Sequence, residues 1–123
     1  MDKNIRNLIE PIIDLNIRYY IVSLALRHGY ASIDERPEFL EVKTEVLIGY
    51  KAKAYDLMRT ARINKDDDEL RDLMLERSMS LFERALDFKE AQKLAKELDN
   101  EYASNRYRQI IELEEKAILL SSL

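Results

Sequence analysis

The chain has 123 residues, of which 46% are hydrophobic and 36% charged, a mix that suits one folded domain and excludes a disordered chain. It contains two glycines and two prolines, too few for the many turns of a β-sandwich or a Rossmann fold. It has no cysteine and one histidine, which excludes disulfides, thiolate metal sites and most histidine metal sites. We therefore predict a single all-α domain over residues 1–123, a small helical bundle of three to five helices with a long C-terminal helix or a kinked helix pair.

The first predicted helix, residues 4–28, is apolar around nearly its whole circumference between Leu15 and Leu26. A helix of this kind is surrounded by protein, and a partner chain would enclose it more easily than the other helices of one small chain. Pro11 is expected either to kink this helix or to precede its start. Residues 19–22 also suit a strand, but the sequence offers no second strand to pair with them.

The second predicted helix covers residues 37–62. Ser32 and Glu35 have capping-box spacing before it, and Pro37 is tolerated in a first helical turn. Its apolar residues follow helical steps of three and four: Val42, Val46, Tyr50, Ala54, Leu57 and Ala61. Gly49 lies within this helix, where glycine is unfavourable, so it is expected to mark a close helix crossing.

The third predicted helical segment runs from residue 67 onward, after a capping-box pair formed by Asp66 and Glu69. One mostly apolar stripe continues through it. Its mean spacing lies between the repeat of coiled coils, about 3.5 residues, and that of straight helices, about 3.6 residues. The stripe contains Leu70, Met74, Arg77, Leu81, Ala85, Phe88, Ala91, Ala95, Leu98, Tyr102, Arg106, Ile110, Leu113, Ala117 and Leu120.

The length of this segment means that the helix is either broken or part of an elongated molecule. An unbroken helix would be roughly 75 Å long, whereas a globule of this chain length has a radius of gyration of about 14 Å. Asp87 and Glu90 form one possible capping box, and residues 99–105 are rich in poor helix formers. We predict a break near residues 99–105, with an unbroken rod in a dimer as the alternative.

A basic face in the second helix is the strongest chemical signal. Lys51, Tyr55, Arg59 and Arg62 share one side at helical spacing, so they could contact phosphates or a partner, with Tyr55 stacking on a base. The alternative is a solvated face whose cations suit a helix C-terminus and are neutralised by the acidic residues 66–69. A pI near 5.1 argues against a dedicated nucleic-acid binder.

Catalytic motifs are not recognisable. No nucleophile with a base at known spacing is present, and no Glu-x-x-His pair suggests a di-iron bundle site. His28, beside Gly29, is better explained as part of a helix C-cap than as a general base. The sequence therefore predicts no enzyme activity, no metal and no cofactor.

Association with protein is the predicted function. Apolar helix surface exceeds what one short bundle can hide, and seven tyrosines suit interfaces, although Tyr107 and Tyr30 lie outside the predicted stripes. We expect a homodimer that acts as an adaptor, regulator or assembly factor on an unidentified protein. Its predicted interface comprises Leu15, Tyr19, Val22, Leu26, Tyr102, Ile110 and Leu113. The alternative is a nucleic-acid-associated factor that uses the basic face in residues 51–65.

Cellular location follows from the lack of membrane and targeting signals. The longest uncharged stretch near the N-terminus, residues 19–26, is far shorter than the about 20 apolar residues of a spanning helix. The start Met1-Asp2-Lys3 is not followed by a signal-peptide cleavage pattern. We expect a cytoplasmic protein that does not contact membranes.

Overall fold

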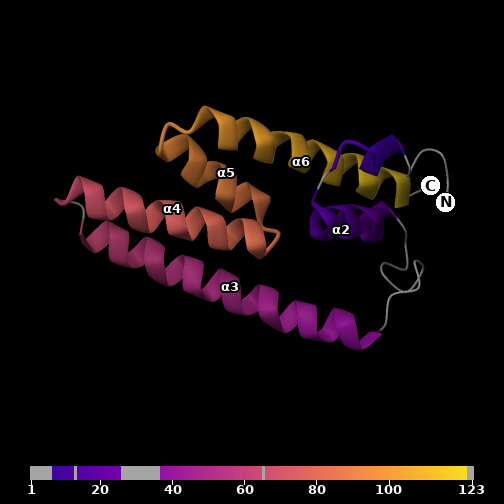
Figure 1. Cartoon of the computed structure of the whole chain (residues 1–123), viewed down its shortest axis with the longest axis horizontal. Helices are drawn as coiled ribbons and strands as arrows, with labels where there is room; N and C mark the ends of the chain where they lie inside the picture. Colours follow the sequence, from indigo (N-terminus) through magenta and orange to yellow (C-terminus); the bar gives the residue numbers. More distant parts are fainter. Residues whose placement is uncertain (1–6, 13, 26–36, 65, 122–123) are drawn as a thin grey trace. The chain divides into compact units, whose positions relative to one another are not determined.

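The computed structural model describes residues 7–12, 14–25, 37–64 and 66–121. The labelled helices are α2 (Leu15–Ala25), α3 (Pro37–Ile63), α4 (Asp68–Arg84), α5 (Phe88–Glu97) and α6 (Glu101–Ser121) (Figure 1). These residues contain no strand, which confirms the small all-α bundle with a long C-terminal helix and makes the strand alternative for residues 19–22 wrong. The chain divides into a central unit, residues 43–109, and a terminal unit formed by the described residues before 43 and by 110–121.

The core of the central unit is built from alanines of α3 and from large and small residues of α4, α5 and the first part of α6. Its buried members are Ala54, Ala61, Leu75, Ser78, Phe82, Phe88, Ala91, Leu94, Ala95, Ala103 and Tyr107. The Phe82 ring meets the Tyr55 ring edge to face, with centroids 5.0 Å apart. The buried Ser78 hydroxyl donates a 2.7 Å hydrogen bond to the Ala54 carbonyl oxygen, which ties α4 to α3.

Two tight corners connect α4 to α5 and α5 to α6. At the first corner the Leu86 amide donates to the Glu83 carbonyl and the Asp87 amide to the Phe82 carbonyl, which is the Schellman pattern. Leu86 has a φ of 60°, the left-handed conformation that this motif requires. The Asp87 carboxylate then accepts from the Glu90 amide at 3.3 Å and caps α5.

The second corner repeats the first. The Asp99 amide donates to Lys96 and the Asn100 amide to Ala95, with Asp99 at a φ of 55°. The Asn100 side chain accepts from the Ala103 amide at 3.0 Å and caps α6. The long segment after residue 67 is therefore broken twice, at 85–87 and at 98–100. The unbroken rod is wrong. The break predicted near 99–105 is confirmed, and in the structure it begins at 98, one residue earlier than predicted.

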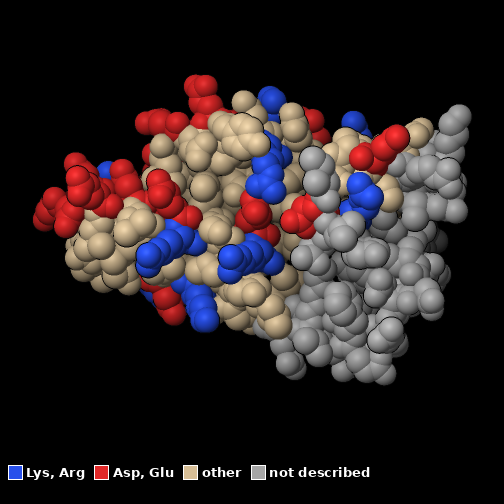
Figure 2. Space-filling model, viewed as in Figure 1, with Lys and Arg blue, Asp and Glu red and all other residues tan. Residues whose placement is uncertain are grey.

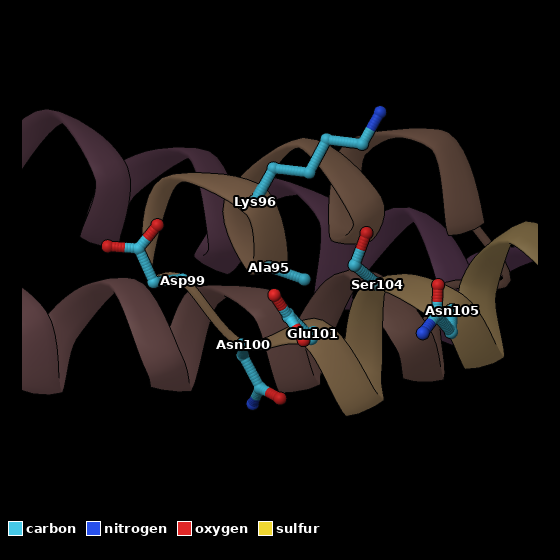
Figure 3. A pocket seen from close by; sticks show the side chains of 7 residues that line it. All are labelled: Ala95, Lys96, Asp99, Asn100, Glu101, Ser104 and Asn105. Carbon is cyan, nitrogen blue, oxygen red and sulfur yellow. The ribbon is translucent and has the colours of Figure 1, made fainter.

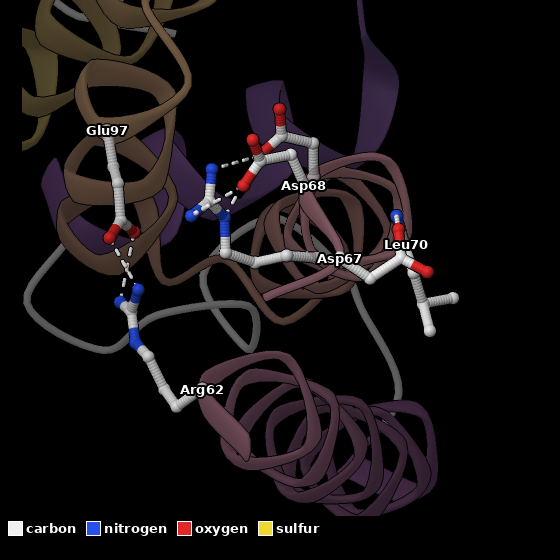
Figure 4. A network of polar contacts seen from close by, with 7 residues as sticks. Arg62, Asp67, Asp68, Leu70 and Glu97 are labelled. Atoms are coloured by element: carbon white, nitrogen blue, oxygen red, sulfur yellow. Dashed lines mark hydrogen bonds and ion pairs between the residues drawn. The ribbon is translucent and has the colours of Figure 1, made fainter. Parts of the chain in front are cut away.

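The start of α4 differs by one residue from the prediction. Asp67, rather than Asp66, is the N-cap, and its carboxylate accepts from the Leu70 amide at 3.1 Å (Figure 4). The Asp67 amide in turn donates to the Asn64 carbonyl, so the turn after α3 places residue 67 at the helix start. Asp68 and Glu69 lie in the first turn, where negative charge is favoured by the helix dipole.

The terminal unit contains α2 and the second half of α6. Asp14 caps α2, since its carboxylate accepts from the Ile17 amide at 3.1 Å. Ile17, Ile21 and Ala25, each four residues after the last, are buried along one side of α2. A short helical turn over residues 7–9 ends before Pro11, so the helix begins after the proline, one of the two predicted outcomes.

Gly49 does not mark a helix crossing. A methyl group added at its Cα would meet no atom of another described element within 4 Å, and the residue is exposed. The expected close approach is therefore wrong. The predicted caps at Ser32, Glu35, His28 and Gly29 lie outside the described residues.

Candidate interaction surface

One side of α3 presents apolar side chains to solvent. Ile48, Ala52, Tyr55, Arg59 and Ile63 follow one another at steps of four, three, four and four residues, so they share one stripe of the helix. We call this stripe the outer face of α3. Ile48 is 64% exposed, Ile63 80% and Tyr55 38%. The opposite side of α3 carries the buried Ala54 and Ala61, and Tyr55, whose ring packs against Phe82, lies at the border between the packed side and the exposed stripe.

Two of the predicted basic residues are joined to carboxylates of α5. Lys51 Nζ lies 2.9 Å from an Asp87 oxygen. Arg62 forms a two-pronged contact with Glu97, in which Nη2 lies 2.9 Å from Oε2 (Figure 4). These pairs fix the edge of the outer face against α5. Asp87 therefore has two roles, because the same carboxylate caps α5 and holds Lys51.

These contacts change the acid–base properties of the cations in one direction. The hydrogen bond to Asp87, helped by its negative charge, raises the pKa of Lys51. The hydrogen bond to Glu97 raises the pKa of Arg62. Both side chains are charged throughout the physiological pH range.

Arg59 has a local partner. Its guanidinium binds the carboxylate of Asp56, three residues earlier on the same helix. Both side chains are largely exposed, so this pair contributes little to stability. Its effect is on charge: the three cations Lys51, Arg59 and Arg62 are matched by three carboxylates, and this side of α3 is close to neutral.

The acidity of the central unit lies elsewhere. Acidic side chains gather at the end of the unit where α4 begins (Figure 2), as expected from the exposed residues Asp66, Asp67, Asp68 and Glu69. The sequence suggested that these residues neutralise the basic face. The neutralising carboxylates are instead Asp56, Asp87 and Glu97.

The predicted site residues fall into two groups. Lys51, Tyr55, Arg59 and Arg62 all lie on one continuous helix, as the spacing predicted. Of the predicted dimer seam, Tyr102 is 82% exposed, Ile110 is buried and Leu113 half-buried. Leu15, Tyr19 and Val22 lie in α2 without described side chains, and Leu26 lies outside the described residues.

Sequence reasoning missed Ile48 and Ile63, the most exposed apolar members of the outer face. Their helical spacing with Tyr55 and Arg59 was the available signal. The prediction instead followed the cations Lys51, Arg59 and Arg62 on the adjoining side of the helix. Tyr107 was placed outside the core and is instead 3% exposed, with its ring 6.3 Å from that of Phe88. Burial, followed by the negative charge of Glu83, raises the pKa of Tyr107.

A hollow of about 310 Å³ lies at the corner between α5 and α6 (Figure 3). It is lined by Ala95, Lys96, Asp99, Asn100, Glu101, Ser104 and Asn105. Figure 3 shows their polar ends pointing in different directions rather than converging on one point. Within the described part of the chain, no group of three histidine, cysteine or acidic residues could hold a metal ion. The hollow therefore has no arrangement that indicates a ligand.

No family model, curated protein or solved structure matches this chain. Among the described helices, none is long and apolar enough to cross a membrane.

Proposed function

We propose that the chain is a non-catalytic helical protein-interaction module that acts as a homo-oligomer, with the outer face of α3 as its contact surface. The observation that carries this proposal is the exposure of Ile48, Tyr55 and Ile63 on one stripe. Large exposed apolar side chains grouped on one helix mark an interaction site, because isolated ones are common but an aligned set is not. Tyrosine and arginine within the stripe suit the centre of such a contact.

The charge pattern favours protein over nucleic acid as the partner. A phosphate backbone binds cations that are free to replace its counterions. Lys51, Arg59 and Arg62 each hold a carboxylate already. A nucleic acid would have to displace those carboxylates or bind beside them, which removes most of the electrostatic gain.

The test is the oligomeric mass of the full chain by sedimentation velocity, from low micromolar to several hundred micromolar concentration. We expect the wild type to form dimers as the concentration rises. Ile63→Asp places a charge in the apolar contact and is expected to leave the chain monomeric. Leu73→Asp is the matched control, because Leu73 is also exposed and apolar but belongs to α4.

Two results would contradict the proposal. One is a wild-type chain that stays monomeric over the whole concentration range. The other is an equal response of the Ile63→Asp and Leu73→Asp variants, since the outer face of α3 would then have no special part in association. Circular dichroism of both variants establishes that they remain helical.

A further inference from the structure

We infer that the partner on the outer face of α3 is a second copy of this chain, docked with its own α3 antiparallel and related by a two-fold axis beside Tyr55. This inference rests on the proposed function and adds the two-fold symmetry of the pair, the direction of the partner helix and the register. Symmetric dimers are the commonest assemblies of soluble proteins, and their interface must be complementary to itself. The outer face of α3 meets that requirement in shape and in charge.

Shape complementarity follows from the order of the side chains along the stripe. In the antiparallel register, Ile48 of one copy faces Ile63 of the other, so the two ends of the contact are apolar. Ala52 faces Arg59, which sets the smallest side chain of the stripe against the longest. The two Tyr55 side chains, whose rings pack against Phe82 of their own chains, lie beside the axis about one residue apart along the helix. At the Ala52–Arg59 positions a large group thus opposes a small one, which favours close packing.

A parallel pairing of the same stripe is unfavourable. It sets Arg59 against Arg59, so the two longest side chains of the stripe compete for the same space. It also sets Ala52 against Ala52 directly beside two opposed Tyr55 rings, which leaves a gap next to a crowded position. The antiparallel register avoids both defects, because each Arg59 then faces Ala52 of the other copy.

Charge balance makes the same face compatible with a copy of itself. The axis brings Lys51 of one copy near Arg62 of the other, at the edge of the contact. Each of these cations carries its own α5 carboxylate, Asp87 or Glu97, so the edge consists of neutral pairs rather than facing positive charges. An acidic partner would gain little attraction here, because both cations are already paired. A second copy of the chain, which carries the same neutral pairs, would meet no repulsion.

The strength of the contact is limited by its length. The stripe from Ile48 to Ile63 spans roughly 22 Å of helix. Two helix faces of this length give an interface at the small end of the known range. We therefore expect a dissociation constant in the micromolar range and a dimer that forms and separates readily.

Disulfide trapping tests the register, because the chain has no cysteine of its own. Ala52→Cys and Arg59→Cys are made as separate variants of the full chain and oxidised alone and as a mixture. In the antiparallel register, position 52 faces position 59 of the other copy, so the mixture is expected to give a cross-linked heterodimer. The two copies of position 52 lie roughly 10 Å apart along the helices, beyond the about 7 Å that a disulfide allows between Cα atoms. Ser80→Cys, an exposed position on α4, measures collisional cross-linking.

The outcomes separate the register from the proposed function. Cross-linking of the mixture well above the Ser80→Cys background supports the antiparallel dimer. Efficient cross-linking of Ala52→Cys with itself overturns the register and indicates a parallel pair, while leaving the outer face as the contact. Background cross-linking in every arm, together with dimers that Ile63→Asp abolishes, overturns the register as well. Failure of the proposed function is different, because the wild type would then be monomeric in sedimentation.

Discussion

The hydrogen bond from Ser78 to Ala54 offers a direct test of how α3 is held in place. Ser78 is fully buried, and its hydroxyl donates to a carbonyl that lies within α3. Removal of the hydroxyl in Ser78→Ala leaves no unpaired acceptor, because the Ala54 carbonyl is also available to the helical ladder of α3. The expected loss is therefore that of the bond alone, about 1 kcal/mol in the free energy of unfolding.

Helix propensity has to be separated from this loss. Alanine is the better helix former by up to about 0.7 kcal/mol, so Ser78→Ala combines a loss with a gain. Ser80→Ala, at an exposed position of the same helix, gives the gain without the bond. Chemical denaturation with an unchanged m-value is the assay, and we expect Ser78→Ala to be about 1 kcal/mol less stable than Ser80→Ala. Equal effects of the two substitutions would show that the bond contributes nothing.

Three further outcomes are expected. Gly49→Ala should stabilise the chain by about 1 kcal/mol, because the added methyl meets nothing and helix propensity improves; a loss in thermal denaturation would contradict this. Asp87→Ala should cost about 1 kcal/mol through the lost α5 cap, whereas Asp87→Asn keeps a capping oxygen and loses only the partly exposed pair with Lys51, so chemical denaturation should find it less harmful. The raised pKa of Tyr107 means that the unfolded tyrosine ionises first, near its ordinary value of 10.0, so its contribution is complete below that pH and is lost as the pH rises. Tyr107→Phe should therefore flatten the alkaline fall in stability, and Tyr102→Phe, at an exposed tyrosine, should leave it unchanged.

Helix boundaries were largely predictable because local chemistry decides them. The start of α3 at Pro37 and its end within one residue of 62 follow from the residues themselves. Asp87 and Asn100 cap the next helix in the way that aspartate and asparagine favour. The choice between Asp66 and Asp67 was beyond the sequence, since neighbouring aspartates are equally able caps and the turn from Asn64 selects one.

Burial was harder to predict in α4 than in α5 and α6, where the stripe residues Phe88, Ala91, Ala95, Ile110 and Ala117 are buried. The stripe drawn through Leu70, Met74 and Arg77 lies beside the true buried side of α4, which contains Leu75, Ser78 and Phe82. Because Ser78, a polar residue, lies at the centre of that side, a search for apolar residues at helical spacing does not find it. Tyr107 was missed because the predicted stripe passes through Tyr102 and Arg106 at the start of α6, where the neighbouring residues Ala103 and Tyr107 are the buried ones.

The candidate surface was half visible in the sequence. Its position on α3 and its residues Tyr55 and Arg59 follow from helical spacing. The partners of Lys51 and Arg62 do not, because Asp87 and Glu97 come from another helix and meet them only after folding. This long-range pairing changes a basic face into a neutral one.

The two corners at Leu86 and Asp99 have a consequence for changes in chain length. Asp87 and Asn100 each donate the backbone hydrogen bond that ends one helix and accept the side-chain hydrogen bond that caps the next. No further residue therefore separates the two helices at either corner. An inserted residue would turn every later side chain by about 100° around its axis and expose what is now buried. Insertions and deletions are therefore tolerated poorly between Asp68 and Gln109, and a peptide tag placed within the central unit belongs at the Asn64–Asp67 turn.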